Sequence, residues 1–220
     1  MSAVMKMDVF GDRSAKGNRS LTLTALEHLE AGIRQRIDAF LEDHRRLRQH
    51  AGSPRRILGA GVRLATATDL AAVCDLAVET LLELFRLRGV AISVVETYDG
   101  DRLSFSRHRG VQSVEPDDLI FEADSSLVAA LQSEKKPLNV SDLVGRTGPR
   151  SKERSVLRRL ECELVVPLVG EDRVLGLLLL TRHTHGAPFP DDDIQLIAAY
   201  GSFLSLTVEN ILLRSASQWP

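Results

Sequence analysis

The chain has 220 residues, of which 44% are hydrophobic and only 5% aromatic, and its formal net charge is −2. These values fit one domain of ordinary size with an appendage, and the core of that domain must be aliphatic. The small negative charge argues against a general nucleic-acid binder, because such domains are usually markedly basic. Two cysteines exclude a disulfide framework.

The first 20 residues are small, polar and charged, and they lack the apolar stretch of a secretory signal. We expect them to have no fixed structure. The longest unbroken apolar run, Val174 to Leu180, is far shorter than the ~20 residues that a membrane span needs. We therefore expect a cytoplasmic protein without membrane or nucleic-acid partners.

Residues 21–63 predict a helical segment that precedes the compact domain. Its apolar residues recur every seven positions and form a narrow stripe, which is typical of a helix that pairs with another helix. The alternative is a helix that packs on its own domain. The pattern favours a homodimer held by coiled-coil pairing of the terminal helices. The interface would be formed by Leu26, Ile33, Phe40, Leu47, Leu206 and Ile211.

The predicted domain, residues 64–214, opens with a helix. Thr68 and Asp69 have the character of an N-cap, and apolar residues follow at helical spacing from Leu70 to Phe85. We expect Gly89 to stop this helix. A β-branched strand at 90–97 and a half-solvated strand at 103–108 flank an Asp-Gly turn, which predicts a β-hairpin.

The rest of the domain alternates short elements with a second hairpin. Short helices are predicted at 127–132 and 153–160, with a short strand at 138–140 between them. Apolar runs at 164–169 and 174–180 flank a tight turn, and a long helix spans 191–214. Residues 215–220 form a tail. The elements predict an α+β fold with a central antiparallel sheet of about six strands.

Four segments of the domain resemble the GAF domain family of small-molecule sensor modules, over about Leu64 to Leu213. Pro167, Gly176, Phe189 and Asn210 occupy positions that the family commonly conserves in its pattern, whereas Ser205 and Thr207 stand near the usual alanine. The segments are TDLAAVCDLAVETLLELF at 68–85, LNVSDL at 138–143, LVVPLVGEDRVLGLLLL at 164–180 and FPDDDIQLIAAYGSFLSLTVENILL at 189–213.

The resemblance implies a sheet with the terminal helices on one face and a helical and loop lid on the other, above a ligand pocket. It implies a non-enzymatic sensory or regulatory domain of signal transduction that binds a small ligand. The alternative is a ligand-free scaffold for protein–protein interaction, a role that many family members have. The sequence does not match the patterns of bilin-binding, cyclic-nucleotide-binding or methionine sulfoxide reductase members, and it identifies no cofactor.

Two groups of residues are candidates for ligand binding. The first group is apolar, and for each member taken singly a core position is the simpler interpretation. The second belongs to a basic cluster within residues 146–159, where guanidinium groups would bind an anion or would simply form a solvated surface. The candidates are the apolar residues Phe105, Phe121, Leu127, Leu138 and Val166, the basic residues Arg150, Arg154 and Arg158, and, outside both groups, Asp142.

Other reactive side chains carry less weight. His183 and His185 have the spacing of two metal ligands on a strand, but they lack further ligands nearby, so an exposed loop is the simpler interpretation. Cys74 and Cys162 are expected to be buried small hydrophobic residues. No nucleophile elbow or phosphate-binding loop is present, and we predict neither a catalytic residue nor a metal site.

Overall fold

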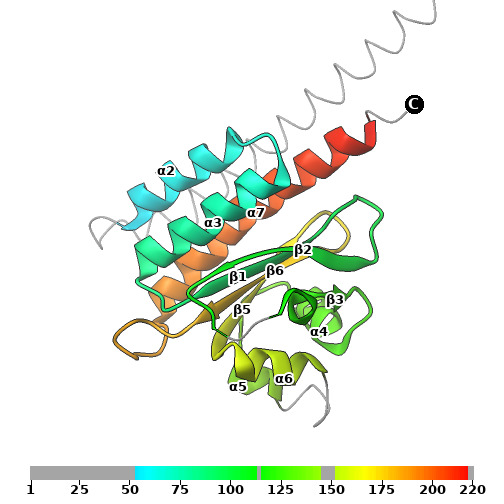
Figure 1. The fold of residues 1–220 in the computed structure, drawn as a ribbon. Coiled ribbons are helices and arrows are strands. Elements are labelled where there is room, and N and C mark those ends of the chain that lie inside the picture. Colours follow the sequence, from blue (N-terminus) through cyan, green and yellow to red (C-terminus); the bar gives the residue numbers. More distant parts are fainter. Residues whose placement is uncertain (1–52, 113–114, 145–151, 218–220) are drawn as a thin grey trace, which may run out of the picture. The chain divides into compact units, whose positions relative to one another are not determined.

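The computed structural model describes residues 53–112, 115–144 and 152–217. Three helices in this part of the chain pack together on one face of a sheet (Figure 1). They are α2 (Ser53–Ala65), α3 (Leu70–Phe85) and α7 (Asp191–Ser217). The predicted unstructured residues 1–20 and the predicted interface residues Leu26, Ile33, Phe40 and Leu47 lie outside the described residues.

The sheet has six strands in the order β3-β2-β1-β6-β5-β4, and all its neighbouring strands are antiparallel. This arrangement confirms the predicted α+β fold with about six strands. Both predicted hairpins are present, and they place β1 and β6 side by side at the centre. The strands are β1 (Val90–Val95), β2 (Arg102–Arg109), β3 (Phe121–Glu122), β4 (Leu138–Asn139), β5 (Cys162–Val169) and β6 (Val174–Thr181).

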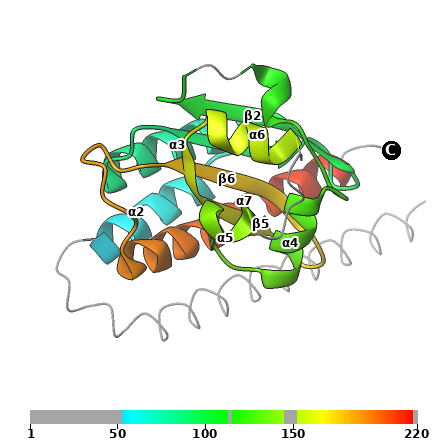
Figure 2. The same ribbon diagram turned by 90° about the horizontal axis from the view of Figure 1, so that it is seen from below.

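The second face of the sheet, which we call the lid face, is covered by short elements (Figures 1 and 2). The opposite face carries the three long helices, and we call it the helix face. This division confirms the layout that the family resemblance implies. The lid elements are the 3-10 helix η2 (Pro116–Leu119) and the helices α4 (Ser126–Glu134), α5 (Val140–Val144) and α6 (Lys152–Arg159).

Helix α3 begins as predicted and ends earlier than predicted. The side chain of Asp69 accepts a hydrogen bond of 2.8 Å from the backbone N–H of Ala72, which satisfies one of the free amide groups of the first turn. The helix ends at Arg86, which adopts a left-handed conformation with φ of 50°. The prediction that Gly89 stops the helix was wrong. Gly89 instead packs tightly on Gly110. A Cβ atom added to Gly89 would lie 2.8 Å from the carbonyl group of Gly110.

Helix α2 belongs to the core of the described domain. Its residues Ile57, Ala60 and Leu64 are buried, and the helix packs against α3 and α7. It begins at Ser53 with Pro54 in its first turn, where proline is tolerated because the first amide groups have no helical acceptor. The helix therefore spans the predicted boundary between residues 63 and 64.

Helix α7 is apolar over most of its length. Among the described residues, the segment Asp191–Ala216 is the one helix long and apolar enough to cross a membrane by length and composition, and 61% of its most apolar window is buried inside the protein. A core helix of a folded domain has the same properties. Of the two interface residues predicted on α7, Leu206 is half-buried and Ile211 is buried.

Candidate functional site

The lid packs directly on the sheet through aliphatic side chains. Ser93, which is fully buried on β1, donates a hydrogen bond of 2.7 Å to the carbonyl oxygen of Leu119, so its hydroxyl group is satisfied by η2. The lid elements contribute side chains that are each at most 3% exposed, and their contacts fill the space above the sheet. These residues are Leu119, Leu127, Leu131, Leu143, Val156 and Leu157.

The predicted apolar pocket residues divide between the two faces. Phe121, Leu127 and Leu138 are buried on the lid side. Phe105 lies on the helix face, since the side chain of Arg107, which lies over the Phe105 ring, pairs with Asp75 of α3. Val166 lies there too, because it faces Gly201 of α7. Phe105 and Val166 therefore cannot line a pocket under the lid together with the other three.

A register shift in the β1–β2 hairpin explains the position of Phe105. Leu103 pairs with Val95, whereas Phe105 pairs with Val94, and the shift falls between Val94 and Val95. Adjacent residues of a strand point to opposite faces, so a shift of one residue moves the side chains that follow to the other face. Regular alternation, on which the sequence-based prediction rested, does not hold across this irregularity.

Three of the four predicted polar residues lie on the lid helices α5 and α6. Asp142 is exposed on α5, Arg154 is half-buried and Arg158 is exposed on α6, and Arg150 lies outside the described residues. Helix α6 turns its buried residues, Val156 and Leu157, toward the sheet. Asp142 and Arg158, which are exposed, are thus separated from the buried phenylalanine and leucine residues of the lid face.

An ion pair links two lid elements. Arg159 of α6 pairs with Asp118 of η2. The backbone N–H of Glu115, which donates to Asp118 at 3.1 Å, and the guanidinium group of Arg159 together hold the pKa of Asp118 below its usual range. The sequence placed Arg159 in the basic cluster, but its partner is distant in the chain and no local pattern identifies it.

The turn between β5 and β6 is bound by side chains from both faces of the sheet. From the lid side, Gln132 of α4 donates a hydrogen bond of 2.9 Å to the carbonyl oxygen of Asp172. From the helix side, Glu209 of α7 accepts a hydrogen bond of 2.9 Å from the backbone N–H of Glu171. We call Gly170–Arg173 the junction turn. Sequence reasoning missed this role, since both partners come from distant helices.

Both thiol groups are buried. Cys74 lies on α3 with no exposed surface, and Cys162 begins β5 with 7% exposed. Desolvation by burial raises the pKa of each thiol to about 12. The thiolate is the reactive form of cysteine, so very little of either residue is nucleophilic near neutral pH. The cysteines lie in the core as the sequence analysis expected.

We therefore predict that neither cysteine reacts with iodoacetamide in the native protein at pH 8. Both should be alkylated within the same time once the protein is unfolded in urea, because unfolding restores the ordinary thiol pKa and access. Intact-protein mass spectrometry counts the added groups. Rapid native alkylation of either residue, at a rate near that of the unfolded chain, would contradict the burial described here.

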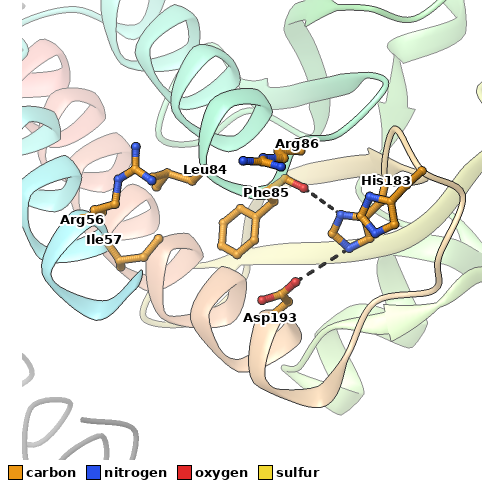
Figure 3. Close-up of a pocket in the computed structure, with 8 residues that line it drawn as sticks. Arg56, Ile57, Leu84, Phe85, Arg86, His183 and Asp193 are labelled. Carbon is orange, nitrogen blue, oxygen red and sulfur yellow. Dashed lines mark hydrogen bonds and ion pairs between the residues drawn. The ribbon is translucent and has the colours of Figure 1, made fainter. Parts of the chain in front are cut away.

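A pocket of about 150 Å³ opens on the helix side, away from the lid (Figure 3). It lies between the start of α2, the end of α3, the loop that follows β6 and the first turn of α7. Arg56 and Ile57 come from α2, residues 84–86 from α3, and His183, His185 and Asp193 from the loop and α7. The lining combines cationic and apolar side chains with one carboxylate.

His183 is the most buried polar group of this pocket. It is 4% exposed, so the expectation that it lies in an exposed loop was wrong, whereas His185 is exposed. Its Nδ1 atom lies 2.7 Å from the carbonyl oxygen of Phe85, and its Nε2 atom lies 3.7 Å from Oδ2 of Asp193 (Figure 3). Burial raises the pKa of Asp193, and His183 acts in the opposite direction.

The described residues contain no group of three or more histidine, cysteine, aspartate or glutamate side chains placed to hold a metal ion. The rings of His183 and His185 stack, with their centroids 5.2 Å apart. Two imidazoles alone are fewer than the three or four protein ligands that zinc sites in proteins use.

Comparison with known families identifies the fold. The family described as GAF domain matches residues 69–208, which is more than half of the chain. The chain belongs to the GAF domain family. This match confirms the family resemblance read from the sequence, and it covers every element from α3 through most of α7. Comparison with curated proteins gives no match.

Solved structures with the same fold include regulatory and enzymatic proteins. A methyl-accepting chemotaxis protein fragment, residues 122 to 287, superposes with a TM-score of 0.55 at 17% identity, covering 71% of this chain and 99% of that one. The GAF domain of a phosphoenolpyruvate-protein phosphotransferase from Coxiella burnetii gives 0.57 at 13%, covering 74% and 96%. The free methionine-R-sulfoxide reductase from Neisseria meningitidis gives 0.52 at 16%, covering 74% and 91%. At these identities the similarity establishes the GAF fold alone.

Proposed function

We propose that this GAF domain is a non-enzymatic regulatory module that transmits the packing state of its lid to its long C-terminal helix. In this proposal it acts in the cytoplasm, as a homodimer, within a signal-transduction pathway. The input is a small ligand at the lid, for which the basic cluster favours an anion. The alternative input is a partner protein bound by a ligand-free scaffold. Membership of a family of sensory and regulatory domains supports the general assignment.

The observation that carries the proposal is the junction turn. Gln132 of α4 and Glu209 of α7 bind neighbouring peptide groups of one tight turn, from opposite faces of the sheet. Arg173 in the same turn donates a hydrogen bond of 2.7 Å to the carbonyl oxygen of Gly100 in the β1–β2 hairpin. A displacement of α4 would move the turn and thereby change the contact with α7, so the lid and the long helix share one mechanical element.

The state of the thiols supports a non-enzymatic role. A reductase is among the proteins of similar structure. A cysteine that acts as a nucleophile needs an accessible thiolate. Here both thiols are buried and both have a pKa raised to about 12. Neither residue is therefore prepared to act as a nucleophile in the conformation described.

The packing of the lid is the specific observation behind the scaffold alternative. Leu127, Leu131 and Leu157 fill the lid face with almost no exposed surface, and Ser93 is already hydrogen bonded. A ligand at the lid face would have to displace these contacts. The exposed guanidinium group of Arg158 is the feature that supports binding of an anion, and it lies on the outer side of α6.

Dimerisation is proposed through the terminal helices. Among the large hydrophobic residues described, Val62 of α2 stands out because 67% of its surface is exposed, and Leu206 of α7 is half-buried. We expect light scattering to give the mass of a dimer at micromolar concentrations. A monomer at every concentration would contradict this part of the proposal and leave the relay between lid and helix unaffected.

The relay is tested by Glu209→Ala, with Gln195→Ala as the matched control because Gln195 is exposed on the same helix. Loss of the Glu209 acceptor should speed amide hydrogen exchange in the junction turn by roughly fivefold, as expected for one hydrogen bond. The proposal requires that exchange in α4 also increases. Hydrogen exchange read by mass spectrometry measures both segments. Faster exchange in the turn with no change in α4 would overturn the relay.

A further inference from the structure

Two arginine side chains from different helices line the pocket on the helix side. Arg56 comes from α2 and Arg86 from the end of α3, and both side chains are exposed at the pocket. Within the part of the chain that the structure describes, neither forms an ion pair. Other arginines of the domain do pair, as Arg107 does with Asp75 and Arg182 with Glu163. The pocket thus holds cationic charge that the described domain leaves available.

The backbone conformation of Arg86 is energetically unfavourable. Arg86 is the C-cap of α3 with φ of 50° and ψ of 51°, a left-handed conformation that glycine usually supplies at this position. A non-glycine residue there is strained by about 1 kcal/mol or more. The side chain of Arg86 lines the pocket.

His183 presents an unsatisfied nitrogen in the same pocket. Because the Phe85 carbonyl oxygen can only accept, Nδ1 of His183 carries the hydrogen of their 2.7 Å contact. Nε2 is buried without a hydrogen-bond partner among the described residues, since Asp193 Oδ2 at 3.7 Å is too distant. Buried polar atoms nearly always have a partner in native proteins, so this nitrogen calls for one.

The remaining wall of the pocket is apolar. Phe85 and Ile57 are almost fully buried, and Leu84 is half-buried beside them. The volume of about 150 Å³ holds several water molecules, and thus a small organic acid. An apolar wall offers nothing to an inorganic anion such as phosphate, but it gains free energy by covering hydrocarbon. The lining therefore fits an anion that carries an apolar body.

We propose that this pocket binds a small organic carboxylate. Its carboxylate group contacts the guanidinium group of Arg86 beside the imidazole ring of His183, and its hydrocarbon part lies on Phe85 and Ile57. The positive charges of Arg56 and Arg86 face the single carboxylate of Asp193, so the net charge favours an anion. The occupant would contact α2, α3 and the loop before α7 together, on the face opposite the lid.

Benzoate is the probe for this proposal, tested on the full chain by isothermal titration calorimetry and by NMR chemical shifts. We expect binding in the millimolar range or tighter, with shifts concentrated at residues 84–86 and 183–185. Benzyl alcohol, which has the same ring without the charge, and inorganic phosphate, which has charge without the ring, should each bind far more weakly. Equal binding of either would overturn the proposal, as would the absence of benzoate binding or shifts confined to the lid face.

Arg86→Gln is the decisive variant, with Arg88→Gln as its matched control. Both substitutions remove one exposed arginine just after α3, but Arg88 does not line the pocket. Loss of a hydrogen bond to a charged group should weaken benzoate binding about tenfold in Arg86→Gln and leave it unchanged in Arg88→Gln. Equal weakening of benzoate binding in both variants would show that benzoate responds only to the general charge of the surface, and it would refute the proposed site. The thermal midpoint of each free variant establishes that it is folded.

Discussion

Replacement of Gly176 by valine is expected to lower the free energy of unfolding by about 3 kcal/mol. Gly176 lies in β6, between β1 and β5 at the centre of the sheet. A Cβ atom at this position would lie 2.7 Å from the carbonyl oxygen of Ser93, 2.7 Å from Cγ1 of Val94 and 3.0 Å from Cδ1 of Leu168. A backbone carbonyl in a central strand cannot move aside without breaking the hydrogen bonds between strands. The destabilisation therefore comes from overpacking and not from the loss of a contact.

The control for this substitution is Gly59→Ala in α2, where a Cβ atom would meet nothing within 4 Å. Alanine is a better helix former than glycine, so this change should stabilise the protein by about 0.5–1 kcal/mol. Urea denaturation followed by circular dichroism gives both values. The loss of unfolding free energy in Gly176→Val should exceed the gain in Gly59→Ala. A smaller loss would contradict the close approach of the three central strands.

The second large effect concerns the lid. Leu131→Ala in α4 should cost about 2–5 kcal/mol, because Leu131 has no exposed surface and its truncation leaves a cavity between the lid and the sheet. Leu81→Ala in α3 is the matched control, since Leu81 is equally buried on the helix face. Equilibrium denaturation should give comparable losses for the two variants, as the chemistry of the truncation is the same.

The two leucine variants should differ in which segments exchange their amide hydrogens faster. If the lid opens as a unit, Leu131→Ala should speed amide exchange in α4 and in the junction turn more than in α3, whereas Leu81→Ala should do the reverse. Hydrogen exchange under native conditions measures each segment. A loss below about 1 kcal/mol for Leu131→Ala would mean that α4 covers the sheet without packing on it, and the lid would then have little to transmit.

Local patterns predicted most of the elements, and long-range contacts account for what they missed. The long helices and the two hairpins depend on spacing and turn residues, which are visible in the sequence. Val166 lies in a strand that is buried on both faces, so the sequence has no alternation to assign its side. Phe105 follows a register shift, which reverses the alternation that was used to place it.

The features that matter for the proposed site were harder to predict. Glu209 reads as one more charged residue on a helix, and only the fold brings it to the junction turn. Asp118 and Arg159 meet because η2 and α6 fold over the same sheet. His183 was expected in an exposed loop, but the loop closes on the end of α3, where Leu87 and His183 form an isolated bridge. Contacts of this kind carry no signature in sequence spacing.

Both outer strands of the sheet are very short. Strand β3 holds Phe121–Glu122 and strand β4 holds Leu138–Asn139, and each ends after two residues. Another chain adds to a sheet by hydrogen bonding along a row of free peptide groups, and a two-residue strand offers almost none. Strand addition is therefore disfavoured at β3 and β4 themselves, which cover only Arg102 and Leu103 of β2 and Leu164 and Val165 of β5.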